Sequence, residues 1–197
     1  MEHKANIKKD LKMKEFCRVL KSVFEQVLML ENYPRSQIDL QVFVLQADGG
    51  YRSAAFNAVS LALMDAGIAM KDFLVATTSG LLQNVAVLDL IYQEEKRQNC
   101  EFVAVYLQKA QRLAYVNLNC NKISLTEFEK LLNMSVQSCE VMASEMRKAV
   151  KRQIVENKNS FYMNWEIWRA GSHKGIIIKH SYHMTFYIKL RYNYLTR

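Results

Sequence analysis

The chain of 197 residues lacks the patterns that define a metal-binding protein or a small disulfide-built one. Its cysteines are far apart, no two form a Cys-x-x-Cys pair, and no histidine lies close enough to complete a metal set; they are Cys17, Cys100, Cys120 and Cys139. Zinc sites are typically built from closely spaced ligands, and disulfide frameworks from short secreted chains. We therefore expect four reduced thiols, no metal and no cofactor.

Long apolar segments are absent as well. The N-terminus reads Met-Glu-His-Lys and continues with further lysines, so it has none of the apolar stretch that a secretion signal requires. No window of the sequence approaches the length and apolarity of a membrane span. These absences predict an intracellular protein without a membrane partner.

Acidic residues are scarce in the last quarter of the chain. Residues 147–197 hold eleven lysines and arginines but only Glu156 and Glu166, so this segment carries a net charge of +9 and the preceding residues carry −1. A positive charge favours an anionic partner such as nucleic acid only where it lies on the surface that meets the partner. The formal charge of +8 alone is therefore weak evidence for nucleic-acid binding.

The first third of the chain alternates helix and strand patterns. Apolar residues recur every three or four positions over residues 9–30, which predicts a helix that ends before Tyr33-Pro34. Strict alternation over residues 38–44 predicts a strand with one buried face, and Asp48-Gly49-Gly50 ends it in a turn. Small residues mixed with apolar ones predict a closely packed helix over residues 53–66.

The rest of the chain divides into a strand region, a long helix and a tail. Ser124 and Glu127 form a Ser-x-x-Glu capping box, which predicts the start of a helix that continues to about residue 154. We expect one α/β or α+β domain over residues 1–158, followed by a loosely attached basic and aromatic tail over residues 159–197. Four strands are expected, near residues 73–79, 85–90, 102–107 and 113–118.

The tail permits two interpretations. Its basic residues are interleaved with aromatic ones, among them Trp165, Trp168, Tyr182 and Tyr187, and such a segment could stack on RNA bases. An appended segment without any defined docking site explains the same composition.

Residues 33–90 contain four runs that resemble a known family. They read Tyr-Pro-Arg-Ser-Gln-Ile-Asp-Leu, Val-Leu-Gln-Ala-Asp-Gly-Gly, Leu-Met-Asp-Ala-Gly-Ile-Ala-Met-Lys-Asp and Val-Leu-Asp-Leu. In this order and spacing they resemble the RNase PH family, and within it the exosome ring subunit related to the archaeal catalytic subunit. The resemblance covers about residues 10–155. It implies an RNase PH-like fold with the β-α-β layers of the second domain of ribosomal protein S5.

The resemblance implies a phosphorolytic ancestry, in which inorganic phosphate attacks the 3′-terminal phosphodiester of RNA and releases nucleoside diphosphates. Such a site holds one anion against another, so it needs backbone N–H donors, arginines and a carboxylate. Gly49, Gly50, Arg52 and Ser53 lie where the predicted strand ends and the helix begins, which suits an anion site. Arg52 takes the place of the family's phosphate-contacting arginine, whereas Tyr51 replaces a small hydroxyl residue and could crowd the anion. A glycine turn before a core helix is the alternative.

The catalytic stretch departs from the family. The pattern of Asp-Gly, four residues and Asp is matched here by Gln83 to Asp89, so one carboxylate is kept and one is lost. A glutamine side chain neither accepts a proton as a general base nor brings negative charge to a divalent ion. Losing such a group typically costs about 10²–10⁴-fold in rate. We interpret Asp89 as a vestigial catalytic position; a strand-end carboxylate kept for hydrogen bonding is the alternative.

The N-terminal region differs too. Family members carry basic residues there that contact RNA, and Lys8, Lys9 and Lys12 occupy the corresponding region. With Arg18 they could form one side of an electrostatic groove, although a solvated helix face explains the lysines equally well. The family also begins with antiparallel strands that this chain does not contain. We therefore expect an N-terminally truncated domain whose sheet is covered by a partner, or an incomplete isoform or gene model.

Three functions follow. The favoured one is a non-catalytic RNA-binding and scaffolding subunit of the RNA exosome, acting in 3′→5′ processing and degradation of ribosomal and messenger RNA in the nucleus, nucleolus and cytoplasm. Its expected partners are RNA, other RNase PH-like subunits in a six-membered ring, and S1/KH cap subunits. The second is an active phosphate-dependent 3′→5′ exoribonuclease using inorganic phosphate and Mg²⁺. The third is a truncated interaction module without an RNA function.

Overall fold

The computed structural model describes the backbone of residues 2–160, 173–180 and 184–194, and the side chains within residues 11–152. The helices and strands follow in the order α1 (Glu2–Val27), η1 (Leu30–Asn32), β1 (Ser36–Gln46), α2 (Tyr51–Asp65), β2 (Leu74–Leu82), β3 (Val85–Leu88), α3 (Tyr92–Glu95), β4 (Cys100–Leu107), β5 (Arg112–Cys120), α4 (Leu125–Ser160), β6 (His173–His180) and β7 (Met184–Tyr194).

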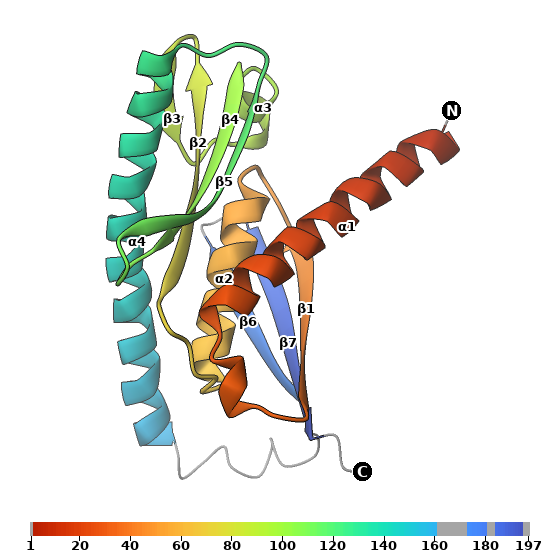
Figure 1. The fold of residues 1–197 in the computed structure, drawn as a ribbon, viewed down its shortest axis with the longest axis vertical. Helices are drawn as coiled ribbons and strands as arrows, with labels where there is room; N and C mark the ends of the chain where they lie inside the picture. The colour runs from red at the N-terminus through yellow and green to blue at the C-terminus, as the bar shows by residue number, and fades with distance from the viewer. Residues whose placement is uncertain (1, 161–172, 181–183, 195–197) are drawn as a thin grey trace.

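The elements stack in layers, with α2 between two sheets (Figure 1). The four-stranded sheet has the order β3-β2-β4-β5 and is antiparallel throughout; α4 packs on one face of it and α2 on the other. The second sheet has the order β1-β7-β6 and also contacts α2. The fold is therefore α+β with β-α-β layers, as the predicted fold class required.

Helix α2 is the centre of the core because it is buried on nearly all sides. Its small residues let both sheets approach the helix axis closely, and Phe56 stacks against Phe24 of α1 with 6.1 Å between ring centroids. One polar side chain is buried with them: the Asn57 amide donates to the Ala76 carbonyl at 2.8 Å and accepts from the Ala76 N–H at 2.7 Å. Asn57 thereby fixes α2 to the middle of β2.

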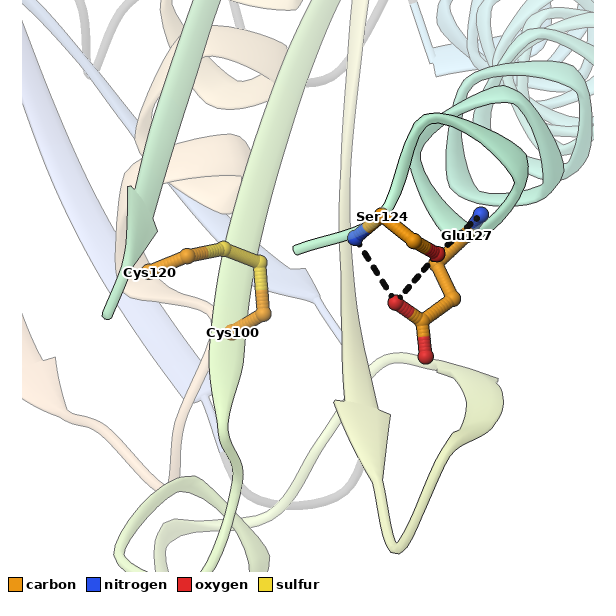
Figure 2. The surroundings of a disulfide bond; sticks show 4 residues. All are labelled: Cys100, Cys120, Ser124 and Glu127. Carbon is orange, nitrogen blue, oxygen red and sulfur yellow. Dashed lines mark hydrogen bonds between the residues drawn. A yellow bond between two sulfur atoms is a disulfide. The ribbon is translucent and has the colours of Figure 1, made fainter. Parts of the chain in front are cut away.

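Helix α4 begins at the predicted capping box (Figure 2). The Glu127 carboxylate accepts from the Ser124 N–H at 2.9 Å and from the Ser124 hydroxyl at 2.6 Å, and these bonds lower the pKa of Glu127. The Glu127 N–H donates back to the Ser124 hydroxyl oxygen at 3.3 Å. The box is confirmed, and the helix continues to Ser160, beyond the predicted end near residue 154.

The described part of the predicted tail forms strands. β7 pairs antiparallel with β1, from Ser36 opposite Tyr194 to Gln46 opposite Thr185, and β6 pairs with β7. The predicted domain boundary at residue 158 falls inside α4 and stays a prediction. Of the aromatic residues proposed to stack on RNA, Trp165, Trp168 and Tyr182 lie outside the described residues, and Tyr187 is described by its backbone alone.

The expectation of four separate thiols is wrong for one pair. Cys100 of β4 and Cys120 of β5 lie directly opposite each other and form a disulfide, with Cα atoms 4.3 Å apart (Figure 2). The antiparallel pairing of β4 with β5 brings together two cysteines that are far apart in the sequence. The remaining two are free: Cys17 is exposed and Cys139 is buried.

The two long helices are amphipathic. In α4 the buried residues recur at three- and four-residue steps, Leu131, Ser135, Cys139, Ala143 and Met146, and charged residues fill the other faces. Within the part of the chain that the structure describes, no helix has both the length and the apolarity to cross a bilayer.

Candidate functional site

The turn between β1 and α2 requires glycine. Gly49 and Gly50 both have left-handed backbones, with φ of 83° and 55°, a region that side chains with a Cβ atom rarely adopt. A Cβ atom on Gly49 would also overlap the carbonyl oxygen of Leu90, because the segment after β3 passes directly against this turn. The two glycines therefore bring the start of α2 against the segment that follows Asp89.

A carboxylate of the chain already occupies the N-terminal end of α2. The Gly50 N–H donates to the Glu95 carboxylate at 2.7 Å, across 45 residues of sequence. Burial raises the pKa of Glu95, and the negative charges of Glu101 and Asp48 raise it further, against the opposing effects of the Gly50 bond and of Arg52. Sequence analysis missed Glu95, because nothing local in Tyr92–Glu95 indicates that it reaches the turn.

Arg52 lies at the same end of α2 but points elsewhere. Its Nε donates to the Tyr51 hydroxyl at 3.3 Å, and its guanidinium carbon lies 5.9 Å from the centre of the Tyr51 ring. Burial lowers the pKa of Arg52, but the hydrogen bond to Tyr51 and the acidic groups of Tyr51, Glu101 and Tyr115 outweigh this, so the pKa is raised. Arg52 is a permanent cation, and Tyr51 positions it.

The other residues predicted around this turn have internal roles. The buried Ser53 hydroxyl donates to the Gly50 carbonyl at 2.9 Å and accepts from the Thr78 hydroxyl at 2.7 Å. The Asp89 N–H donates to the Thr78 carbonyl at 3.0 Å, which places the Asp89 backbone beside this pair while its side chain is exposed. Asp89 therefore lies next to the start of α2, as the resemblance implies, with its carboxylate towards solvent.

Gln83, the position matched to a lost catalytic carboxylate, lies away from Asp89. Gln83 and Asn84 have φ of 50° and 64°, the signature of the type I′ turn that joins β2 to β3. Asp89 follows Leu88, which pairs with Ser79 at the other end of the hairpin. The four residues of β3 separate the turn that holds Gln83 from Asp89 by roughly 13 Å. The carboxylates that accompany Asp89 near the start of α2 are those of Glu95, which accepts the Gly50 N–H, and of Asp48, which accepts the Tyr92 N–H at 3.1 Å.

A pocket of about 270 Å³ opens beside Arg52. It holds two of the predicted cations, Lys12 and Arg52, and one carboxylate, Glu15. Arg18 lies six residues along α1, about 120° around the helix axis from Lys12, and does not line it. The side chains of Lys8 and Lys9 are outside the described ones. The pocket is lined by Lys12, Glu15, Phe16, Val19, Arg52, Phe56, Val103, Tyr115, Asn117, Leu118 and Asn119.

A second, smaller pocket of about 210 Å³ is acidic. Its lining includes the carboxylates of Glu95 and Glu101, several amides and the Cys100–Cys120 pair, and no lysine or arginine. Asn119 lines both pockets. Among the described residues, no three His, Cys, Asp or Glu side chains gather into a metal-binding group. The predicted anion site is therefore split in the structure. Glu95 lies at the N-terminal end of α2, whereas Arg52 lines the first pocket.

Comparison with known proteins gives one family. The 3′ exoribonuclease family, domain 1 (RNase PH), matches residues 2–69. The exosome complex component ski6 of Schizosaccharomyces pombe is 35% identical over 149 residues, which are 76% of this chain and 61% of that protein. The exosome complex component Rrp41 of Nitrosopumilus maritimus is 31% identical over 73% of this chain and 59% of that protein. The chain therefore spans about three fifths of the length of these relatives.

The chain is also similar to a plant protein and, in part, to one solved structure. The exosome complex component RRP41 homolog of Arabidopsis thaliana is 33% identical over 72% of this chain and 58% of that protein. The crystal structure of rice Rrp46 superposes with a TM-score of 0.49 at 24% identity, over 53% of this chain and 49% of that chain.

Proposed function

Because the 3′ exoribonuclease (RNase PH) family model matches residues 2–69 and exosome components are similar over about three quarters of the chain, we propose that it is an exosome ring subunit of this family that binds RNA without cleaving it. It acts in 3′→5′ processing and degradation of ribosomal and messenger RNA, in the nucleus, nucleolus and cytoplasm, beside a separate nuclease. Its partners are RNA, other RNase PH-like subunits in a six-membered ring, and S1/KH cap subunits. The observation that carries the proposal is that Lys12 and Arg52 line one pocket.

RNA binding is supported by the charges of this pocket. Lys12 comes from α1 and Arg52 from α2, so two elements far apart in sequence place cations at one opening. Phosphate contacts supply most of the affinity of proteins that bind single strands, and each neutralised phosphate makes binding more sensitive to salt. Phe16 and Tyr115 add aromatic surface of the kind on which bases stack.

The absence of cleavage is supported by the start of α2. A phosphate that attacks RNA needs free N–H donors at the helix end, and the Gly50 N–H is already bonded to Glu95. An incoming phosphate would also meet the negative charges of Glu95 and Glu101. Gln83 lies in the turn of its hairpin and offers no carboxylate to Asp89.

Ring assembly is supported by the relatives' names and by the surface of β1. The relatives reported above are exosome components. Three consecutive apolar residues near the end of β1 are exposed, Phe43 by 47%, Val44 by 42% and Leu45 by 61%. Apolar side chains in a row on an edge strand favour cover by another protein.

The test is the salt dependence of RNA binding. The full chain is titrated into fluorescently labelled ten-nucleotide single-stranded RNA at several salt concentrations, and anisotropy gives the dissociation constant. Lys12→Ala and Arg52→Gln should each weaken binding and reduce the salt slope by about one. Arg18→Ala, on another face of α1, is the matched control. An RNA affinity that changes neither with salt nor with either substitution would favour an interaction module without an RNA function.

Phosphate-dependent exonuclease activity is the second candidate, because Asp89 and Glu95 both lie beside the β1–α2 turn. It is tested with end-labelled RNA, by incubating the chain alone and with an RNase PH-like partner, with and without inorganic phosphate. Release of nucleoside diphosphates that requires phosphate would overturn the non-catalytic assignment. Glu95→Gln should then abolish this release without weakening RNA binding.

A further inference from the structure

We propose that Tyr115, Asn117 and Asn119 of β5 form a subsite for one nucleobase, placed beside the phosphate-binding cations Lys12 and Arg52. The inference rests on the proposed RNA-binding function and adds what the pocket recognises. Its ligand class is a base with an adjacent phosphate, supplied by an RNA strand or by a free nucleotide.

The three residues share one face of β5. Residues two apart in a strand point to the same side of the sheet, so Tyr115, Asn117 and Asn119 project in the same direction. Asn117 lies opposite Val103 and Asn119 opposite Glu101 in the neighbouring strand β4. All three line the pocket that Lys12 and Arg52 enter from α1 and α2.

Both amides are available to a ligand. In the part of the chain that the structure describes, neither Asn117 nor Asn119 makes a side-chain hydrogen bond. Asn57 shows the contrast, because its buried amide is paired with Ala76 on both atoms. Asn117 is half-buried, but its amide atoms are not among the buried, unpaired side-chain atoms of the described residues, so a ligand can reach them from solvent.

An amide side chain suits the edge of a base. It offers two N–H donors and a carbonyl acceptor in one plane, which match the alternating donors and acceptors of Watson–Crick and Hoogsteen edges. Two such amides at neighbouring positions of one strand can read one edge. The rings of Tyr115 and Phe16, which line the same pocket, supply the apolar surface that an unstacked base requires.

The charges around the pocket fix where the phosphate lies. Lys12 and Arg52 are the cations of this pocket, against the single carboxylate of Glu15, and Arg52 is hydrogen-bonded to Tyr51. On the far side of Asn119 the second pocket carries Glu95 and Glu101 without a cation. A phosphate is therefore attracted to the Lys12 and Arg52 side, and the base falls against β5.

The size of the pocket limits the ligand to one unit. Its volume of about 270 Å³ is below the roughly 300–1,000 Å³ of pockets that enclose drug-sized molecules. It accommodates one base with its phosphate at the opening, and a strand would continue across the surface.

The experiment separates base contacts from phosphate contacts. The full chain is titrated with a ten-nucleotide RNA and with an abasic oligomer of equal length, in which tetrahydrofuran replaces each nucleoside. Asn117→Ala with Asn119→Ala should weaken RNA binding by about tenfold or more and leave the abasic oligomer unaffected. Arg52→Gln should weaken both ligands equally. Asn133→Ala, an exposed asparagine of α4, is the matched control.

The outcomes distinguish the inference from the function on which it rests. Equal losses for RNA and the abasic oligomer in the double variant would overturn the base subsite while RNA binding stands. No binding of either oligomer by the unaltered chain would overturn both. Titration with adenosine and uridine monophosphates tells the two ligand sources apart. If the monophosphates bind about as tightly as the RNA, the natural ligand is a free nucleotide; if only the RNA binds, it is a strand. Asn119 is exposed, so Asn119→Ala alone keeps the test valid if Asn117→Ala destabilises the fold.

Discussion

The carboxylate of Glu95 accepts the backbone N–H of Gly50 at 2.7 Å, which places a negative charge of the chain at the start of α2. A helix N-terminus is where anions bind best, because its N–H groups are unpaired and the helix dipole is positive there. Here one N–H at this end, that of Gly50, is already paired with a carboxylate of the chain. An external anion that binds near Arg52 is therefore repelled by the negative charge of Glu95.

Replacing Glu95 by glutamine should therefore strengthen RNA binding. Glu95→Gln keeps an acceptor for the Gly50 N–H and removes the negative charge, so affinity should rise about threefold at low salt, the effect of one charge several ångströms away near water. The gain should shrink as salt is added. Glu129→Gln, at an exposed position of α4, is the control. Unchanged affinity would show that Glu95 does not act on the RNA site.

The same carboxylate predicts a pH dependence. Because burial raises the pKa of Glu95, it takes up a proton at a higher pH than an ordinary glutamate does. RNA affinity should accordingly begin to rise, as the pH falls, at a higher pH than the protonation of an ordinary glutamate would give. The Glu95→Gln variant should lack this pH-dependent rise in RNA affinity. A rise of equal size in both proteins would assign it to another titratable group.

Cys139 should make the fold less stable in alkali. Burial raises the pKa of Cys139 from 9.0 to about 11. Below pH 9 the Cys139 thiol is protonated in both the folded and the unfolded state, and its contribution to the free energy of unfolding is complete. From pH 9 to 11 the thiol ionises in the unfolded state alone, so this contribution declines. Between pH 8 and 10 the free energy of unfolding should fall by about 1 kcal/mol. Urea unfolding of Cys139→Ala should show a smaller decline; an identical one would exclude Cys139 as the cause.

The Cys100–Cys120 disulfide should stabilise the fold. It closes a loop across a sequence separation of 20, which corresponds to about 3 kcal/mol in the unfolding free energy. Addition of a reductant should lower the urea midpoint accordingly. A variant with both Cys100→Ser and Cys120→Ser should not respond to the reductant. Under denaturing but non-reducing conditions two thiols should react with Ellman's reagent, and four would show that the pair is not bonded.

Asn57→Leu should be among the most damaging substitutions in α2. It leaves the N–H and the carbonyl of Ala76 without the partners that they have in the protein. Each such buried group costs about 1–3 kcal/mol, so the unfolding free energy should drop by about 2 kcal/mol or more. Asn133→Leu on the surface of α4 should change it by less than about 0.5 kcal/mol. Similar midpoints for both variants would contradict the role of Asn57.

Local signals in the sequence predicted local structure well. The Ser124–Glu127 capping box, the glycine turn at Gly49-Gly50 and the strand after Ser36 depend on neighbours in the chain, and the structure contains all three. The predicted alternation of that strand is incomplete, because Val44, on the face expected to be buried, is exposed. Lys12 and Arg52 were also predicted as site residues, and the structure brings them to one pocket.

The missed features depend on contacts between distant segments. Glu95 reaches Gly50 across 45 residues, and the disulfide joins cysteines that are 20 residues apart. Asn117 resembles any other polar strand residue until its register opposite Val103 is known. No periodicity or spacing within one segment carries this information, because it arises from the order in which strands pair.

The pairing of β1 with β7 sets the timing of folding during synthesis. β1 ends at Gln46 and its partner begins at Met184, so the ribosome must add the intervening residues before the sheet can close. At about 5–20 residues per second this takes roughly 7–30 s. Throughout that interval β1 has left the ribosome with its backbone groups unpaired, exposed to neighbouring nascent chains. The cell must protect it, so yield should depend on chaperones more than the final stability would suggest.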